Sequence, residues 1–556
     1  MRVAVAGGGP GGLFLATLLR RAVPGCEVTV FERNRADDTF GFGVVFSDRT
    51  LANVHAADPT LREALSARGR HWDDIEVRLK GERIRCGGNG MTAIERRTLL
   101  SLLQDGARAA GADLRFSTEV GLADLAGHDL VVAADGTGSR IREELRGRGV
   151  DLGTRVETAA AKFIWFGTDH LFDGLTFVHE RGPDGVFAVH GYPIGDATST
   201  FIVETDERSW LAAGLDEFDV TAPPGPSDLK SKAYLEKLFA EQIDGARLLV
   251  NNSRWGSFRT RRTDRWHTLE PWPVALLGDA AHTAHFSVGS GTKMAMEDAI
   301  ALAGALAAHP GDLAAALAAY ETSAQPPVRA VQDSARPSLA WWEHFGAYHD
   351  AFEPWQFAYH FLTRSIGDGR LRRRAAGFVD ASHRAWARAH GAAPLDTPLA
   401  HGGWRCPVRL VDVVTAPDGT PLAVRGDGVP PLELAGAAPS PSPDRPWGAR
   451  LRAPDGESGL PAAEAALAAL LAAGPTGQAG PAGPAAPAVV AVHGGTSLTR
   501  TLLCEAARLR HGVPALLVEP APDRDLAVTA VLSGRADLVG AAASPGTAPA
   551  APGVPA

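Results

Sequence analysis

The sequence predicts an α/β fold in which a parallel sheet is interrupted by an inserted antiparallel sheet and followed by a small α/β unit. Three observations support this fold class. Residues 1–154 alternate short apolar runs with helical patterns, as a parallel sheet covered by helices does. Residues 155–265 contain strand-like runs separated by Gly, Asp and Pro turns. Residues 266–395 return to a strand, a turn and long helices.

The N-terminal segment predicts a strand, a glycine turn, a helix and a second strand. Residues 2–6 are a short apolar run. The G-x-G-x-x-G turn after it contains Gly7, Gly9, Pro10, Gly12 and Leu13. Such a turn lets a pyrophosphate rest on the free N–H groups at the start of the helix. Residues 28–31 predict the second strand, and Glu32 after it can accept hydrogen bonds from a ribose hydroxyl. The segment therefore predicts a Rossmann-like site for NAD or FAD.

Composition excludes several function classes. The 556 residues suggest roughly three or four domains, and a net charge of −9 argues against nucleic acid as a partner. The four cysteines are widely spaced and form no C-x-x-C pair, so we expect reduced thiols and no metal site. No apolar run approaches the ~18 residues that cross a membrane, and no signal peptide is apparent. We expect a cytoplasmic protein.

Two further motifs follow apolar strands. One contains Asp135, Gly136, Ser139 and Arg142, and the other contains Gly278, Asp279, Gly289 and Gly291. Together with the glycine turn, they resemble the three fingerprints of the group A flavoprotein monooxygenases, which are single-component aromatic hydroxylases. The fingerprints occur in the same order and near the same separations, and the resemblance covers residues 1–310. It implies the aromatic hydroxylase fold.

The resemblance also implies FAD as the cofactor and NADH or NADPH as the reductant. The residues that it assigns to FAD are Gly7, Gly9, Pro10, Gly12, Leu13, Glu32, Arg33, Arg96, Asp135, Arg142, Gly278, Asp279, Gly289, Gly291, Thr292 and Lys293. It places Arg96 along the cofactor, Asp279 at the ribityl chain, and the N–H groups from Gly291 to Lys293 at the flavin ring. Arg96 and Arg142 could instead be ordinary surface ion pairs.

Two stretches narrow the resemblance to the branch that acts on aryl-CoA thioesters. They are "FGFGVVFSDRTL" (40–51) and "HFSVGSGTKMAMEDAIALA" (285–303). The implied substrates are O₂ and an aryl-CoA, and we expect salicylyl-CoA to be converted to its 5-hydroxy product. The carbon para to the ring hydroxyl is activated and lies clear of the thioester. Anthraniloyl-CoA or a tryptophan-derived indole is the alternative substrate, and a non-catalytic flavin-binding protein is the alternative of another class.

A base that removes the proton of the ring substituent would make the ring more nucleophilic. The candidates are His190 and Tyr192, on an expected strand, and His285, just before the glycines. Each of them could instead be an ordinary packed or surface residue. Four aromatic residues at helical spacing predict either core or the wall of a ring pocket: Trp341, Trp342, Phe345 and Tyr348.

The C-terminal part is rich in Pro, Ala and Gly. Residues 396–488 predict a linker-rich segment, and residues 542–556 predict a disordered tail. Residues 489–541 alternate strand and helix and resemble the last βα units of an old-yellow-enzyme-like barrel. A complete barrel needs eight units and about 250 residues. We therefore expect a remnant that binds no second flavin, or a small docking element, in a protein that is a monomer or homodimer.

Overall fold

The computed structural model describes residues 1–39, 41–219, 225–286, 291–437, 445–472 and 486–543. By its internal contacts the chain divides into two compact units, Met1–Gly346 and Ala347–Ala556. The sequence grouped residues 266–395 together, whereas the structure divides this stretch. The boundary lies inside helix α9 (Leu313–Ala351), so no loop in the sequence marks it. None of the described helices is long and apolar enough to cross a membrane.

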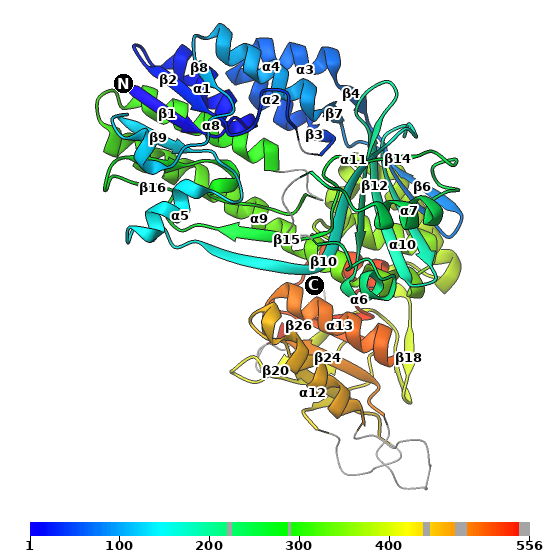
Figure 1. Cartoon of the computed structure of the whole chain (residues 1–556). Coiled ribbons are helices and arrows are strands. Elements are labelled where there is room, and N and C mark those ends of the chain that lie inside the picture. The colour runs from blue at the N-terminus through cyan, green and yellow to red at the C-terminus, as the bar shows by residue number, and fades with distance from the viewer. Residues whose placement is uncertain (40, 220–224, 287–290, 438–444, 473–485, 544–556) are drawn as a thin grey trace, which may run out of the picture. The chain divides into compact units, whose positions relative to one another are not determined.

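The first unit contains a six-stranded, mostly parallel sheet in the order β16-β17-β9-β1-β2-β8 (Figure 1). Its strands are β1 (Arg2–Ala6), β2 (Glu27–Phe31), β8 (Asp113–Arg115), β9 (Leu130–Ala133), β16 (His267–Thr268) and β17 (Val274–Leu276). Strand β1 pairs in parallel with β2 on one side and β9 on the other. Strands β16 and β17 return to this sheet after the insertion, which confirms the predicted interrupted α/β fold.

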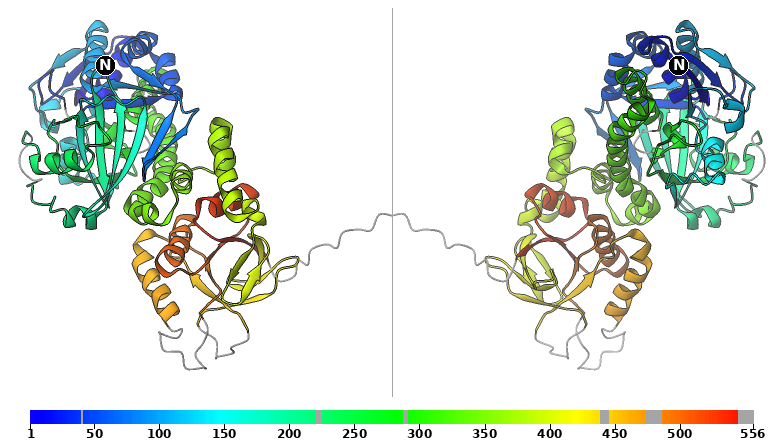
Figure 2. Two further views of the ribbon diagram at one scale, coloured as in Figure 1. Left: turned by 90° about the vertical axis from the view of Figure 1, so that its right-hand side faces the viewer. Right: turned by 90° about the vertical axis from the view of Figure 1, so that its left-hand side faces the viewer.

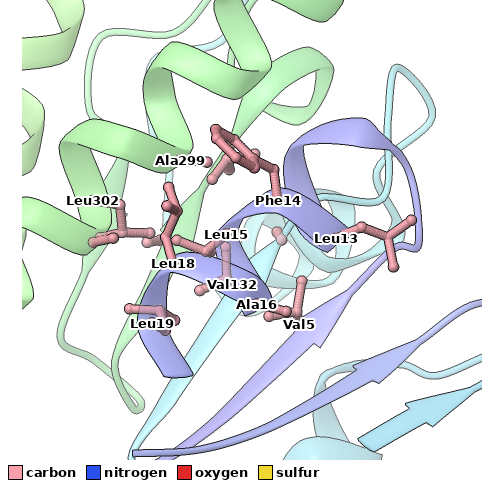
Figure 3. Packing of buried hydrophobic residues seen from close by; sticks show 14 of the residues in the cluster. Val5, Leu13, Phe14, Leu15, Ala16, Leu18, Leu19, Val132, Ala299 and Leu302 are labelled. Carbon is pink, nitrogen blue, oxygen red and sulfur yellow. The ribbon is translucent and has the colours of Figure 1, made fainter. Parts of the chain in front are cut away.

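Helix α1 (Pro10–Ala22) is apolar on most of its surface because it lies between this sheet and α8 (Gly291–Ala308). Figure 3 shows Leu15 and Leu18 of α1 beside Leu302 of α8, with Val5 of β1 nearby. Full burial of each such leucine contributes about 1.5–3 kcal/mol. This packing fixes the start of α1, and with it the glycine turn.

A small sheet and four helices surround this core. Their bounds are β3 (Gly43–Ser47), β4 (Arg70–Trp72), β7 (Met91–Glu95), α2 (Asp48–Ala57), α3 (Pro59–Arg68), α4 (Arg96–Ala109) and α5 (Arg140–Gly147). The Ser47 hydroxyl accepts a hydrogen bond from the Thr50 N–H at 3.4 Å and caps α2. The "FSDRTL" stretch therefore forms a strand end and a helix start.

The inserted sheet has the order β14-β10-β13-β12-β11-β5-β6, and β15 pairs with β10. Its strands are β5 (Ile75–Leu79), β6 (Glu82–Cys86), β10 (Arg155–Thr168), β11 (Leu175–Gly182), β12 (Gly185–Pro193), β13 (Ser199–Thr205), β14 (Leu248–Leu249) and β15 (Gly256–Arg262). The sequence placed β5 and β6 in the first domain. Their short alternating pattern predicts a strand but does not say which sheet it joins.

The inserted sheet has two different faces, because successive side chains of a strand point to opposite sides. One face is apolar and packs under α6 (Glu207–Ala212) and α7 (Leu229–Leu238). Its strand residues include Ile164, Phe166, Val178, Phe187, Val189, Phe201 and Val203. The other face carries His190, Tyr192 and Glu204, because Glu204 pairs with Ala188 across β12 and β13. Aromatic residues of α9 cover this second face.

The second unit contains a closed barrel of seven described strands, β20 to β26, with helices α12 and α13 outside its strands (Figure 2). The strands are β20 (Leu410–Thr415), β21 (Pro421–Arg425), β22 (Leu432–Ala435), β23 (Gly448–Arg452), β24 (Val489–His493), β25 (Ala515–Glu519) and β26 (Leu538–Ala543). The other elements are α10 (Pro354–Leu362), α11 (Asp368–His390), β18 (Leu399–His401), β19 (Trp404–Cys406), α12 (Leu460–Ala472), α13 (Ser497–His511) and α14 (Arg524–Ser533).

The prediction of a linker over residues 396–488 is wrong for the described part of this stretch. Strand β20 pairs in parallel with β26, which closes the barrel around Val411, Val413 and Leu432. These strands are short, and the Pro- and Gly-rich residues between them resemble a linker. Their apolar residues are buried only when distant strands complete the ring. Most of the predicted tail lies outside the described residues, although residues 542 and 543 belong to β26.

Candidate active site

The glycine turn after β1 is closed on one side and open on the other. Gly7 has φ +114°, and a Cβ there would lie 2.2 Å from the carbonyl oxygen of Ala134. A Cβ on Gly12 would lie 2.2 Å from the carbonyl oxygen of Gly7. A Cβ on Gly9 would meet no atom within 4 Å. Gly9 is the N-cap of α1, so the free N–H groups of this helix start beside the open side.

Glu32 lies directly against this turn. Its Oε2 accepts a hydrogen bond from the Gly8 N–H at 2.7 Å, and its Oε1 accepts one from the Asn34 N–H at 2.8 Å. A cavity of about 160 Å³ opens beside it. The cavity is lined by residues that include Gly8, Gly9, Pro10, Glu32, Arg96 and Gln104. Arg33 is exposed and is not among the lining residues.

Arg142 joins the second glycine motif to the third. Its Nη1 donates to the carbonyl oxygen of Ala280 at 2.6 Å, and its Nη2 donates to that of Thr137 at 3.2 Å. The side chain is buried, which lowers the pKa of Arg142 and contradicts the surface ion-pair alternative. Burial also raises the pKa of Asp135, whose Oδ2 accepts the Ile141 N–H.

Arg96 and Asp279 are oppositely charged side chains that interact electrostatically with each other. Burial lowers the pKa of Arg96, and its guanidinium lies 5.9 Å from the Trp165 ring. Its Nε has no hydrogen-bond partner in the described part of the chain. Burial raises the pKa of Asp279, which nearby His282, Arg96 and Arg261 oppose. Nε of Arg96 therefore keeps unused capacity to donate to a polar ligand.

Asp298 holds the turn that carries Asp279. Its Oδ2 accepts a hydrogen bond from the Gly278 N–H at 2.9 Å and lies 2.7 Å from Nε2 of His282. Both side chains are about 2% exposed, and His282 packs on Trp266. The pair fixes the backbone of η2 (Gly278–Ala280).

The third motif continues into α8. Gly291 begins this helix, and a Cβ there would meet no atom within 4 Å. Thr292 is partly exposed, and Nζ of Lys293 donates to Oε2 of Glu297 at 2.8 Å. Gly289 lies outside the described residues.

Two of the three predicted catalytic residues meet at Glu204. Its Oε1 lies 3.5 Å from Nε2 of His190 and 3.5 Å from Nε2 of His285, which is ion-pair distance. All three side chains are buried. His190 stands on β12, whereas His285 lies between η2 and α8. The cluster therefore joins the inserted sheet to the segment that carries the third motif.

Tyr192 lies two residues from His190 but in a separate environment. Its hydroxyl donates to the carbonyl oxygen of Gly43 at 3.4 Å, and its ring stacks on Trp72. Burial raises the pKa of Tyr192 to about 12. The phenol thus keeps its proton near neutral pH and serves as a donor rather than a base.

Aromatic rings surround the His190–Glu204–His285 cluster. The Trp342 ring lies 4.6 Å from that of His190, and the Phe286 ring lies 4.4 Å from that of His285. Trp341 and Phe345 pack against Trp342. Trp341, Trp342 and Phe345 are therefore core residues of the first unit, and their role as the wall of a ring pocket stays a prediction. Tyr348 belongs to the second unit, where its hydroxyl donates to Glu505.

A family model described as FAD binding domain matches residues 1–335, more than half of the chain. The chain belongs to this family of FAD-dependent monooxygenases. A salicyloyl-CoA 5-hydroxylase from Streptomyces sp. is 54% identical over 97% of this chain and 99% of its own length. A 3-hydroxy-4-methyl-anthranilyl-[aryl-carrier protein] 5-monooxygenase from Streptosporangium sibiricum is 38% identical over 61% of this chain and 89% of its own. A solved structure of P. aeruginosa PqsL has a TM-score of 0.48 and 23% identity, and covers 62% of this chain and 96% of its own.

The residues of this monooxygenase fit FAD, the predicted cofactor that the family confirms. The open side of Gly9 and the adjoining cavity leave space for the nucleotide half. Nε of Arg96 and Oδ1 of Asp135 are buried atoms without a hydrogen-bond partner among the described residues, as expected of groups that meet a polar ligand. The individual contacts of these residues with FAD stay predictions.

Sequence reasoning missed two carboxylates of this monooxygenase. Glu204 occupies one position of a strand, and Asp298 one position of a long helix. Glu204 belongs to no motif of fixed spacing, whereas Asp298 lies within the stretch 285–303 that carried the resemblance but was given no role there. The repeated histidines in "AHTAHF", which contains His282 and His285, were the one local sign that buried acids lie nearby.

Proposed function

We propose that this monooxygenase hydroxylates salicyloyl-CoA (salicylyl-CoA) at C5, with NADH or NADPH and O₂ as co-substrates. The relative named salicyloyl-CoA 5-hydroxylase supports this substrate, because the 54% identity extends over nearly the whole of both chains. That coverage includes the second unit as well as the first. The relative therefore matches this chain over both units and not only over the FAD-binding part.

FAD, when bound, supplies electron transfer from the nicotinamide and activation of O₂. The glycine turn and Glu32 would hold its nucleotide half. Arg96 and Asp279 would hold its middle, and the N–H groups at the start of α8 would stabilise negative charge on its ring. Asp298 and Arg142 keep these segments in place through the backbone of Gly278 and Ala280.

The observation that carries the proposal is the His190–Glu204–His285 cluster within its aromatic wall. Rings such as Trp342 and Phe286 match an aryl substrate, and histidine can accept a proton near neutral pH. Loss of the ring hydroxyl proton makes the ortho and para carbons more nucleophilic. The para carbon lies away from the bulky thioester, which favours the 5-hydroxy product.

The test is a substrate panel on the purified holoenzyme. NADH or NADPH oxidation, O₂ uptake and product mass are measured with salicyloyl-CoA, anthraniloyl-CoA and free salicylate. We expect salicyloyl-CoA to give a 5-hydroxy product with matching NAD(P)H and O₂ consumption. Equal turnover of free salicylate would contradict the thioester assignment. NAD(P)H oxidation that no aryl compound stimulates would instead favour a non-catalytic role for the bound flavin.

An aminobenzoyl thioester is the second candidate. The 3-hydroxy-4-methyl-anthranilyl 5-monooxygenase is 38% identical and acts, by its name, on an aryl group attached to a carrier protein. An amino group activates the same para carbon as a hydroxyl does. Faster turnover of anthraniloyl-CoA than of salicyloyl-CoA in the same panel would favour this candidate.

A further inference from the structure

Glu204 lies where two parts of the first unit meet. It stands on β13, between β10 and β12, and its side chain is 1% exposed. One carboxylate oxygen, Oε1, lies 3.5 Å from Nε2 of both His190 and His285. The two histidines come from segments separated by 95 residues, so only the folded chain brings them to one oxygen.

The charges of this cluster limit how many protons it holds. A buried carboxylate costs several kcal/mol unless its charge is compensated. With both histidines neutral the cluster carries a net charge of −1, and with both protonated it carries +1. Uptake of one proton, shared between His190 and His285, takes the cluster from −1 to neutral. Groups that interact this closely titrate as a pair rather than singly.

Two other polar or ionisable groups on the neighbouring elements have partners of their own. Tyr192 of β12 donates to Gly43, and Glu343 of α9 accepts the N–H of Ala160. Other groups on this side are His179 of β11, which stacks on Trp342, and the Arg96–Asp279 pair. On the side of β15, Phe258 contributes an apolar ring against His285. Glu204 is the carboxylate that lies at ion-pair distance from both histidines.

We propose that Glu204 is a positioning residue that joins His190 and His285 into one proton-accepting unit for the aryl hydroxyl of the substrate. The inference rests on the proposed function. In this step the phenol O–H bond breaks, its electron pair stays on oxygen, and the proton passes to an imidazole nitrogen not turned toward Glu204. The carboxylate stabilises the imidazolium that forms. Removal of the charge of Glu204 removes this stabilisation from both histidines.

The test compares wild-type holoenzyme with Glu204→Gln, which keeps the shape of the side chain and removes its charge. Glu180→Gln is the matched control, because Glu180 lies on the opposite face of the same sheet, beside Gln242. FAD content, the phenolate absorbance of bound salicyloyl-CoA against pH, and kcat and KM against pH are measured. For Glu204→Gln we expect unchanged FAD content and a phenolate midpoint about one pH unit or more higher. We also expect kcat to fall about tenfold or more with little change in KM.

The outcomes separate this inference from the proposed function. If wild type hydroxylates salicyloyl-CoA and Glu204→Gln has the same phenolate titration and pH profile, the inference is wrong and the function stands. If wild type neither binds nor hydroxylates this thioester, the proposed function fails and the inference falls with it. Should Glu204→Gln not fold, His190→Gln, His285→Gln and the double variant decide. If the two histidines act as one unit, the double variant should lose about as much kcat as the worse single variant. If the kcat losses of the two single variants instead multiply in the double variant, the inference is wrong.

Discussion

Nη1 of Arg142 donates to the carbonyl oxygen of Ala280 across 2.6 Å. The two residues are 138 positions apart in the chain, and each belongs to a different cofactor-binding motif. The bond lies inside the protein, where water cannot replace the donor. Arg142 therefore links two motifs that lie on either side of the inserted sheet in the sequence, and it does so through backbone carbonyl groups.

Replacement of Arg142 by Met is expected to reduce the stability of the first unit. The carbonyl groups of Ala280 and Thr137 would lose their donor, at a cost of about 1–3 kcal/mol. Chemical unfolding of the holoenzyme and retention of FAD on dilution would measure this. The control is Arg146→Met, because Arg146 lies on the same helix with its side chain 75% exposed. Equal effects of the two substitutions would contradict the linking role.

Asp279→Asn is expected to weaken FAD binding about tenfold or more, because a charged hydrogen bond contributes roughly 1.5–3 kcal/mol. In the apo-protein, by contrast, the substitution should raise stability relative to wild type as pH rises. Burial raises the pKa of Asp279 above its ordinary value, so the folded state holds this proton more tightly than the unfolded state. Its contribution to stability is present at low pH and is lost as pH rises through the raised pKa. Unfolding of the two apo-proteins against pH should show this loss in wild type alone.

Tyr192→Phe is expected to leave the pH dependence of kcat unchanged across the neutral range. The phenol has its pKa raised to about 12 and stays protonated there. Removal of the hydroxyl loses the bond to Gly43, which costs about 0.5–1.5 kcal/mol of stability. A pH–rate profile and an unfolding curve test both statements. If one limb of the profile disappeared, Tyr192 would have to be restored as the base.

Truncation at Arg445 is expected to expose the apolar interior of the second unit. It would remove β23 to β26, the strands that pair with β20 and β22. Val413 and Val424 would then lose their cover. Size-exclusion chromatography and binding of a hydrophobic dye should reveal aggregation. A chain that ends at residue 543 keeps every described strand and should behave as the full chain does, whereas a monodisperse Arg445 truncation would contradict the closed barrel.

The predictions that succeeded depend on chemistry that is local in the chain. Gly7, Gly12 and Glu32 stand at fixed distances from a strand and a helix, so the tight turn and the carboxylate beside it can be predicted from spacing, whereas their contacts with FAD stay predictions. Glu204 differs, because in "STFIVET" it resembles any polar residue that alternates with apolar ones. Its burial depends on His190 and on a segment that returns much later in the chain. A local pattern does not contain that information.

The barrel strands show the same limit at the level of the fold. Residues 410–415 and 538–543 form adjacent strands, yet nothing near either segment marks the other as its partner. Proline, alanine and glycine between the strands reinforced the expectation of a linker. A Pro-, Ala- and Gly-rich composition indicates loops, but it does not indicate short strands whose pairing partners lie far away in the sequence.

The chain passes between the two large sheets of the first unit four times. The parallel sheet draws its strands from three separate stretches, residues 2–31, 113–133 and 267–276, and the inserted sheet draws on residues 75–86 and 155–262. Neither sheet can be expressed alone as one contiguous piece. A graft of the inserted sheet from a relative would need two simultaneous insertions with four matched junctions. New substrate preferences on this scaffold should therefore arise by point substitution in place rather than by exchange of modules.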